Sequence, residues 1–546
     1  YIILYLDGLT GQGLFHTSLL PDVSGGMFGL YHLDFDGVTL KEIDKLDYPA
    51  GSEDISFGRF PDGSPEVQSF AEPTPRSSNV APSENLIAPK IFSSGQTLPV
   101  LVRYSDPDLF PETMNRSENI ELVQQSIITD QVYLRKGLGL EWITPSMDED
   151  VVLKLEDDSH DLTFDSHRPI RIRSEKILRS QVWTADYDYE IISALNIPAN
   201  ATLTIEAGTR IFIKKYANIT VEGQIQINGV PGNPVVILPL AAGERWGGIQ
   251  IHSGYGSVNI SHCFLVQGGK GISKNPGSYD KQAVIESERP LFLDNVYMIE
   301  LGGKGVHVKD AKLEMHNSVL YNCLSGIELE NSPATITGSH FMYLPNNDNP
   351  NPEDNQDAIT AFGFDGSVEG QITISGSYFY KIGDDGCSFI TDLPVSVRDS
   401  YFDEIEDKAL SAKQSPVDVR FSVIEQSDIG IELDHGSSGD FDHITFYQNR
   451  SAISLSHSDG SFSGANAHIT NSIIAQSEDQ DFKVSDGTSL SAEFNLSTGD
   501  NYPGLGNITG NPRFVEPSTS DFRLSNGSVA INNGDPAYAN DDDGSR

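Results

Sequence analysis

The chain has 546 residues, too many for one compact domain, and its 38% hydrophobic content supports a folded core. A formal net charge of −42 makes nucleic acid a poor partner, because phosphates must be met by clustered lysines and arginines. The 50 glycines, together with abundant Asn, Ser and Asp, favour turns and strands over helices, so we expect an all-β protein.

Three cysteines, Cys263, Cys323 and Cys387, are widely spaced, which argues against a disulfide framework or a metal-binding knuckle. Each lies in a hydrophobic run, and we expect buried free thiols. No apolar stretch is long enough to span a membrane as a helix. The opening YIILYLDG shows neither a basic region nor a cleavage site, so we interpret the chain as a fragment that begins inside a domain.

Residues 1–80 show short strand patterns separated by turn signals such as PDVSGG, which is typical of a small antiparallel β-sandwich. The motif DISFGRFPDG at residues 54–63, followed by PTP at 73–75, resembles the second half of a bacterial lamin-tail domain. The resemblance implies an immunoglobulin-like module, truncated at its N-terminus, that serves attachment on a large secreted or surface protein. Residues 81–176 hold four further strand patterns and are predicted to form a β-rich connector or second small domain.

From residue 177 a short strand pattern with a small residue before a hydrophobic one recurs, as in GKGVHV, DDGCSF and DIGIEL. The small residues are spaced by 21, 32, 28, 23, 21 and 22 residues, and the longer gaps hold insertions such as 345–356. Self-similarity at this period is typical of a solenoid, and the leucine framework of a leucine-rich repeat is absent. Residues 177–546 are therefore predicted to form a right-handed parallel β-helix with two or three strands per coil.

A second element precedes each repeat, as in ISGSYF and VRDSYF, and Asn, Ser and Gly are expected at the corners. We expect Phe379 and Phe402 to stack inside the helix. Tyr378 and Tyr401 alternate with them and are predicted to point outward as carbohydrate-binding residues. The segment around RWGGIQIHSG resembles the opening coils of secreted β-helix proteins, and the last segment resembles their tail, stopping where a closing strand is expected. This resemblance implies a fold but no single function, because β-helices serve as lyases, hydrolases, adhesins and stalks.

Two neighbouring carboxylates, Asp384 and Asp385, stand in IGDDGCSF directly before a small residue of the repeat. In register, Asp384 shares a column with Asp407 and Asp428. Because stacked strands lie about 4.8 Å apart, such carboxylates repel one another unless a cation, a lysine or a raised pKa compensates.

The column next to it holds Asp357 and Asp385 and ends in Lys408, and three interpretations of the two columns stay open. In the first, the aspartates accept backbone hydrogen bonds at an acidic corner and Lys408 balances their charge. In the second, Ca²⁺ is held by oxygen ligands. In the third, Asp384, Asp385 and Lys408 are catalytic. The residues of the calcium interpretation are Asp357, Asp384, Asp385 and Asp407.

The catalytic interpretation divides again. Polygalacturonase-like hydrolases share the fold and an Asp-Asp pair, but their Gly-His-Gly and Arg-Ile-Lys motifs do not follow Asp385 here. Polysaccharide lyases of this fold use a basic residue, and Lys408, Lys413 and Arg420 lie close behind the acidic pair. If the chain is an enzyme, a lyase therefore fits better than a hydrolase.

Taken together, these features indicate part of a secreted or cell-surface protein of a Gram-negative bacterium. We interpret it as a structural or adhesive β-helix that binds carbohydrate, Ca²⁺ or other surface proteins. The alternative is a polysaccharide lyase or glycoside hydrolase that acts on an extracellular polysaccharide.

Overall fold

The structure is a computed structural model that describes residues 179–241, 244–269, 282–344, 356–364, 369–457, 463–499 and 502–537, and the bounds of the strands before them. The chain divides into two compact units, residues 1–167 and 168–546.

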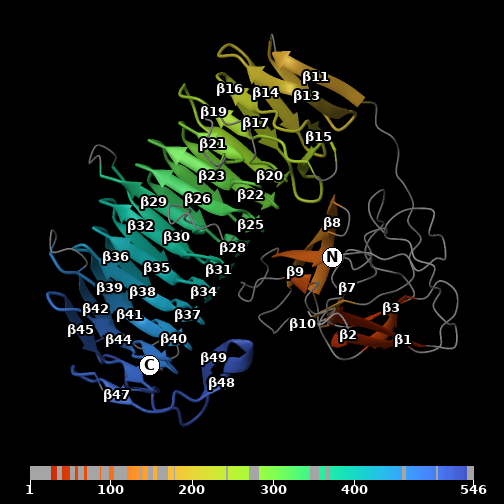
Figure 1. The fold of residues 1–546 in the computed structure, drawn as a ribbon. Helices are drawn as coiled ribbons and strands as arrows, with labels where there is room; N and C mark the ends of the chain where they lie inside the picture. Colours follow the sequence, from red (N-terminus) through yellow and green to blue (C-terminus); the bar gives the residue numbers. More distant parts are fainter. Residues whose placement is uncertain are drawn as a thin grey trace. The chain divides into compact units, whose positions relative to one another are not determined.

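Every strand pairing in the first unit is antiparallel. Three two-stranded pairs and one four-stranded sheet are described (Figure 1). The rest of the lamin-tail-like motif lies outside the described residues, so the lamin-tail assignment and the boundary at residue 80 stay predictions. The pairs are β1 (Gly26–Leu33) with β2 (Leu40–Tyr48), β3 (Ser56–Arg59) with β4 (Val67–Phe70), and β7 (Ile120–Val123) with β10 (Val152–Leu155); the sheet has the order β5 (Leu86–Ile87), β6 (Leu98–Arg103), β9 (Leu138–Pro145) and β8 (Ser126–Arg135).

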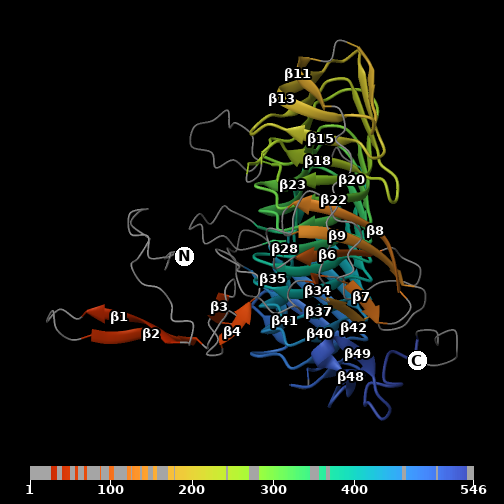
Figure 2. The same ribbon diagram turned by 90° about the vertical axis from the view of Figure 1, so that its right-hand side faces the viewer.

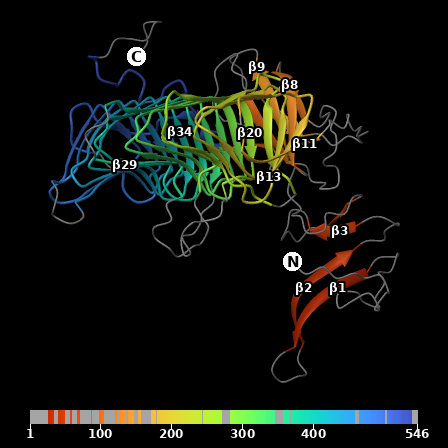
Figure 3. The ribbon, with the colours of Figure 1, turned by 90° about the horizontal axis from the view of Figure 1, so that it is seen from above.

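The second unit confirms the predicted right-handed parallel β-helix. Strands β11 (Ile170–Lys176) to β47 (Ile508–Thr509) form one continuous array whose pairings are all parallel. Figure 3 shows its coils following one another along a single axis, from β11 in orange to the blue C-terminal coils. The first coils contain β12 (Gln181–Trp183), β13 (Asp188–Ile197), β14 (Thr202–Glu206), β15 (Arg210–Ile213), β16 (Ile219–Val221), β17 (Gln224–Asn228), β18 (Val235–Pro239), β19 (Ile249–Ile251), β20 (Val258–Val266), β21 (Ile285–Ser287) and β22 (Leu291–Ile299).

From β23 to β43, each strand pairs with the strand three places further along, so the coils build three parallel sheets, here called A, B and C. Sheet A contains β23 (Lys304–Lys309), β26 (Ser325–Glu330), β29 (Ile359–Gly363), β32 (Cys387–Thr391), β35 (Lys408–Lys413), β38 (Ile429–Asp434), β41 (Ser451–Leu455) and β44 (Phe482–Val484). Sheet B contains β24 (Leu313–His316), β27 (Ala334–Thr337), β30 (Ile372–Ser375), β33 (Val395–Arg398), β36 (Pro416–Arg420), β39 (Ser438–Asp442), β42 (Asn466–Thr470) and β45 (Ser489–Glu493).

Sheet C carries the aromatic residues of the second repeat element. Its strands are β25 (Val319–Tyr321), β28 (His340–Leu344), β31 (Tyr378–Ile382), β34 (Tyr401–Ile405), β37 (Val423–Glu425), β40 (Thr445–Tyr447), β43 (Ile473–Ala475) and β46 (Leu496–Ser497). After the last coil, β48 (Phe514–Glu516) and β49 (Asp521–Leu524) form a hairpin around the short 3₁₀ helix η3 (Pro517–Thr519), which lies near β40 in Figure 2.

The inward side chains form the stacks that the repeat predicts. The ring centroids of Phe341 and Phe379 lie 4.9 Å apart, and those of Phe379 and Phe402 lie 4.4 Å apart, with the rings nearly parallel in both pairs. All three cysteines are buried and free, as predicted. Trp246 is buried and its indole N–H donates to the carbonyl of Val266 at 2.8 Å, which satisfies its polar atom.

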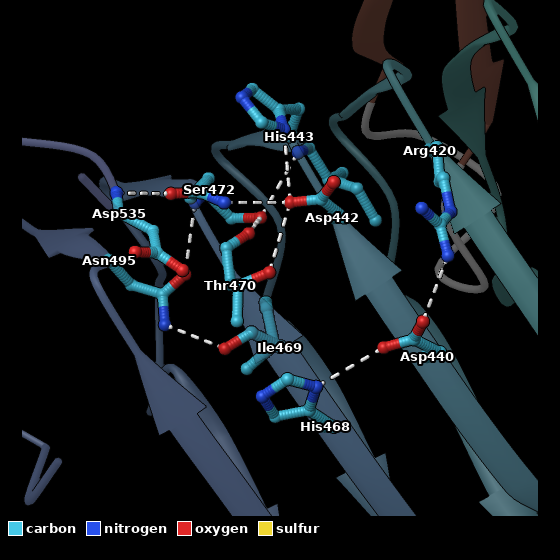
Figure 4. A network of polar contacts seen from close by, with 12 residues as sticks. Arg420, Asp440, Asp442, His443, His468, Ile469, Thr470, Ser472, Asn495 and Asp535 are labelled. Carbon is cyan, nitrogen blue, oxygen red and sulfur yellow. Dashed lines mark hydrogen bonds and ion pairs between the residues drawn. The ribbon is translucent and has the colours of Figure 1, made fainter. Parts of the chain in front are cut away.

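The corner between sheets B and C is held by small polar residues, as predicted. The Ser377 N–H donates to Ser400 Oγ at 3.3 Å, and the Ser400 N–H donates to Ser422 Oγ at 3.2 Å. Further along, Asn495 takes this position: its Oδ1 accepts from the Ser472 N–H and its amide donates to the Ile469 carbonyl (Figure 4). Each corner thus satisfies backbone groups that the turn would otherwise bury without a partner.

The part of the chain that the structure describes contains no helix that is long and apolar enough to span a membrane.

Candidate functional site

The two predicted acidic columns lie where each coil enters sheet A. Ile359 pairs with Cys387, and Cys387 pairs with Leu410, so the residues two places earlier also stack on one another. Asp357, Asp385 and Lys408 therefore share a column. The register predicted from the repeat spacing is confirmed.

Asp357 and Asp385 each accept a backbone hydrogen bond from the next coil. The Asp385 N–H donates to Asp357 Oδ1 at 3.2 Å, and the Lys408 N–H donates to Asp385 Oδ1 at 3.2 Å. Their second oxygens accept from hydroxyls: Thr360 Oγ1 donates to Asp357 Oδ2 at 2.8 Å, and Ser411 Oγ donates to Asp385 Oδ2 at 2.5 Å. Both carboxyl groups are buried and lock successive coils in register.

Burial raises the pKa values of these carboxyl groups, and their different neighbours separate them. Burial raises the pKa of Asp357 to about 8, and the charges of Asp385 and Asp384 add to this. Burial also raises the pKa of Asp385, but only to about 6, because Lys408 and the Ser411 hydroxyl favour its ionised form. The pKa of Asp384 is raised by burial and by Asp407. Asp357 therefore keeps its proton to a higher pH than Asp385 does.

Lys408 supplies the positive charge in this cluster. Its Nζ contacts Asp407 Oδ2 and lies 3.6 Å from Asp385 Oδ1 and 3.9 Å from Glu432 Oε2. Burial acts to lower the pKa of Lys408, but Asp385, Asp407 and Glu432 together outweigh burial and raise it. The amine thus stays protonated, and the geometry favours a charge-balancing cation over a catalytic base.

The other basic residues named from the sequence do not join Lys408. Lys413 ends β35 and is exposed. Arg420 lies in β36 of sheet B, where its guanidinium binds Asp418 at 2.7 Å and Asp440 at 3.0 Å (Figure 4). Lys408, Lys413 and Arg420 are close in the sequence, but their side chains lie on different sheets or on different faces of one sheet.

Three of the four predicted calcium ligands form a candidate cation site. Asp384, Asp385 and Asp407 each offer a carboxylate oxygen, and these oxygens lie within 4.8 Å of one another. Carboxylate oxygens are the ligand type that Ca²⁺ prefers, so the donor set fits by chemistry. However, the ammonium of Lys408 already contacts Asp385 and Asp407, so Ca²⁺ must compete with it.

The acidic column ends at a second charge-balancing cation, which is exposed. Asp428, the third acid in the column of Asp384, binds the guanidinium of Arg450 from the next coil. This hydrogen bond lowers the pKa of Asp428 despite its partial burial. Arg450, and not Lys408, therefore balances most of the charge of Asp428.

The prediction that Tyr378 and Tyr401 form an exposed sugar-binding face is wrong. Only 1% of Tyr378 and 2% of Tyr401 is exposed. The Tyr378 hydroxyl donates to Asp403 Oδ2 at 3.0 Å, and the Tyr401 hydroxyl donates to Glu425 Oε1. Alternation does direct these rings away from the inward phenylalanines, but direction alone does not make a side chain accessible.

Sequence reasoning missed Thr360, Ser411 and Glu432, which lie three places after the column of Asp357, Asp385 and Lys408. Their register was available: Thr360 pairs with Ser388, Ser388 with Ser411, and Ser411 with Glu432. Each lies two places after the small residue of its repeat, so reading the aligned repeats two places past that residue identifies them. The acidic insertion at 345–355 lies outside the described residues.

The β-helix is similar to known proteins in part of its sequence and in its fold. Residues 175–275 match the family model of a pectate-lyase-like β-helix domain, a stretch that precedes the acidic cluster. Among solved structures, the chain is similar to an alginate lyase from Paenibacillus sp. strain FPU-7, with 11% identity and a TM-score of 0.25, over 54% of this chain and 91% of that one. It is also similar to a double mutant of the periplasmic alginate epimerase AlgG, with 11% identity and a TM-score of 0.22, over 60% of this chain and 78% of that one. No curated protein matches the chain.

Proposed function

We propose that the β-helix cleaves an extracellular or periplasmic polysaccharide and that the acidic cluster is its acid–base site. The observation that carries this proposal is the meeting of Asp384, Asp385 and Asp407 within 4.8 Å, beside Asp357. Hydrolysis of a glycosidic bond needs one protonated and one ionised carboxyl group, and the neighbours support such a division: Lys408 and Ser411 favour the ionised form of Asp385, whereas burial and Asp407 raise the pKa of Asp384. The match to a pectate-lyase-like domain model supports a polysaccharide as substrate.

The role of Lys408 favours hydrolysis over elimination. Elimination by a lysine base requires a neutral amine, whereas the carboxylates around Lys408 raise its pKa. Outward positions of sheet A also offer hydroxyl and carboxylate groups in line along the coil axis, a surface suited to a chain of sugar units. The partly exposed residues are Glu328, Thr360 and Glu432, and Ser388 and Ser411 in the same row are buried.

The test is turnover on a panel of acidic and neutral polysaccharides, followed by the release of reducing ends and by the absorbance of unsaturated uronate products. We expect reducing ends without the unsaturated chromophore. Asp384→Asn should lower the rate by roughly 10²- to 10⁴-fold. Asp428→Asn is the matched control, because Asp428 shares the column of Asp384 but binds Arg450.

Three results would count against this proposal. Wild-type protein that turns over no polysaccharide in the panel contradicts catalysis. An equal loss of rate in Asp428→Asn indicates a general effect on the coils instead of an acid–base site. Unsaturated products contradict hydrolysis and point to a lyase.

A second candidate function is a surface scaffold or adhesin whose acidic corner holds the coils together, with or without Ca²⁺. It is favoured by the backbone hydrogen bonds that Asp357 and Asp385 accept from successive coils, since these explain both side chains without catalysis. If Ca²⁺ binds the folded chain, saturating Ca²⁺ should raise the melting temperature, and Asp407→Asn should weaken the effect. A melting temperature that neither Ca²⁺ nor a chelator changes would argue against the ion.

A further inference from the structure

The chain after the last coil folds back over the C-terminal end of sheet C. Ser520 Oγ donates to Glu425 Oε1 at 2.7 Å, and the Asp535 N–H donates to Asn471 Oδ1 at 2.8 Å (Figure 4). The rings of Phe514 and Phe522 pack against Tyr447, with centroids 6.0 and 5.1 Å away. The segment is thus attached to the coils by polar contacts at two places and by an aromatic cluster.

Between this segment and sheet C lies a cavity of about 590 Å³. That volume falls within the range of about 300–1,000 Å³ that is usual for small-molecule sites. Its lining combines the aromatic rings of Tyr447 and Phe514 with two side-chain amides, a threonine hydroxyl and a guanidinium, a composition unlike that of an apolar packing gap. The residues concerned are Tyr447, Gln476 and Thr498 from the coils and Asn511, Arg513 and Phe514 from the returning segment.

Arg513 stands out because of its charge environment. Among the residues that the structure describes, no carboxylate lies within 4.0 Å of its guanidinium, whereas Arg420, Arg450 and Arg523 all bind aspartates. Arg245 and Arg289 also have no carboxylate partner among the described residues, but their guanidinium groups donate to backbone carbonyls, whereas the guanidinium of Arg513 lines a cavity.

The backbone of Arg513 is held in place. Its N–H donates to Asn511 Oδ1 at 2.8 Å, and its carbonyl accepts from the N–H and the hydroxyl of Ser525 at 2.9 and 2.7 Å. These bonds fix a left-handed conformation with φ of 51°, which is uncommon for a residue with a side chain. The side chain of Arg513 therefore leaves a fixed backbone at the cavity wall.

We propose that this cavity binds a uronate unit of an acidic oligosaccharide, with Arg513 holding the carboxylate. A guanidinium binds a carboxylate through two parallel charge-assisted hydrogen bonds. The groups of Gln476, Thr498 and Asn511 match sugar hydroxyls, and the ring of Phe514 offers an apolar face. The site lies on sheet C, apart from the acidic cluster at the entry to sheet A, and does not depend on catalysis there.

Calorimetric titration with trimers of galacturonate, mannuronate and guluronate tests the proposal, with their methyl esters as uncharged counterparts. Wild-type protein should bind at least one acid trimer and bind its methyl ester more weakly. Arg513→Gln should weaken binding of the acid by about 10- to 100-fold, and Arg513→Lys, which keeps the charge but loses the paired geometry, should lie between. Arg523→Gln is the control, because Arg523 binds Asp521 and does not line the cavity.

The melting temperature of each variant shows whether the returning segment remains folded. The proposal is overturned if no acid trimer binds, if the methyl ester binds equally well, or if Arg513→Gln binds like wild type. Asp384→Asn, which tests the acidic cluster, should leave this binding unchanged, so failure of one site is distinguishable from failure of the other.

Discussion

Asp385 is joined to Lys408 twice: its Oδ1 accepts the backbone N–H of Lys408 at 3.2 Å and lies 3.6 Å from the ammonium of the same residue. The first contact holds two coils in register, and the second neutralises the charge that this register brings together. Structural and electrostatic roles therefore meet in one pair of residues.

Replacing Lys408 by methionine removes the cation but keeps most of the side-chain volume. We expect a loss of about 3 kcal/mol of unfolding free energy at pH 7, because buried carboxylates are left without their partner. The loss should shrink at pH 5, where more of these groups are protonated. Urea denaturation at both pH values measures it.

Lys381→Met is the comparison, since the pair of Lys381 and Glu404 is about 40% exposed on each side and should contribute less than about 1 kcal/mol. Added Ca²⁺ should stabilise Lys408→Met more than wild type if the three carboxylates accept an ion. An equal response of both proteins contradicts competition between Lys408 and Ca²⁺.

Asp357 makes stability depend on pH in an unusual direction for an aspartate. Its folded pKa of about 8 lies above the usual value of 3.8, so the folded chain binds this proton more tightly than the unfolded chain. The corresponding stability is fully present below about pH 4 and is lost as pH rises through about 8. Asp357→Asn resembles the protonated form and should be more stable than wild type at pH 8, by roughly 1–3 kcal/mol.

Thermal unfolding from pH 5 to pH 9 tests this, with Asp428→Asn beside it. Asp428 has a lowered pKa, so its substitution should destabilise the chain at neutral pH instead. Identical pH profiles for wild type and Asp357→Asn would show that Asp357 is ionised in the folded state.

Ser400 is a corner residue whose hydroxyl accepts from the Ser377 N–H and donates to the Arg398 carbonyl at 2.7 Å. Ser400→Ala leaves a buried N–H without its partner and should cost about 1–3 kcal/mol. Ser396→Ala, on the outward side of the same coil, should change the unfolding free energy by less than about 0.5 kcal/mol. Chemical denaturation compares the two, and equal effects would contradict the importance of the corner.

Phe379 lies between Phe341 and Phe402 in the inward stack. Phe379→Ala should destabilise the β-helix by about 3–5 kcal/mol, because it removes two ring contacts and leaves a cavity that rigid coils cannot close. Phe379→Leu retains part of the volume and should cost less. A calorimetric unfolding transition that is unchanged in Phe379→Ala would contradict this account of the core.

The sequence by itself determined the repeating fold and its register. A coil of a β-helix contacts mainly its two neighbours, so the spacing of small residues decides which side chains stack, and Phe379 and Phe402 could be paired without a structure. The column of Asp357, Asp385 and Lys408 followed from the same counting.

Only the tertiary structure decided how buried those side chains are and which charges surround them. Tyr378 points away from the inward stack as predicted but is buried, and Lys408 is surrounded by carboxylates that keep it charged. The cavity beside Arg513 needs the returning segment, which contacts coils far away in the sequence. Burial and charge depend on everything that packs around a group, and periodicity along one chain reports only the neighbours in the stack.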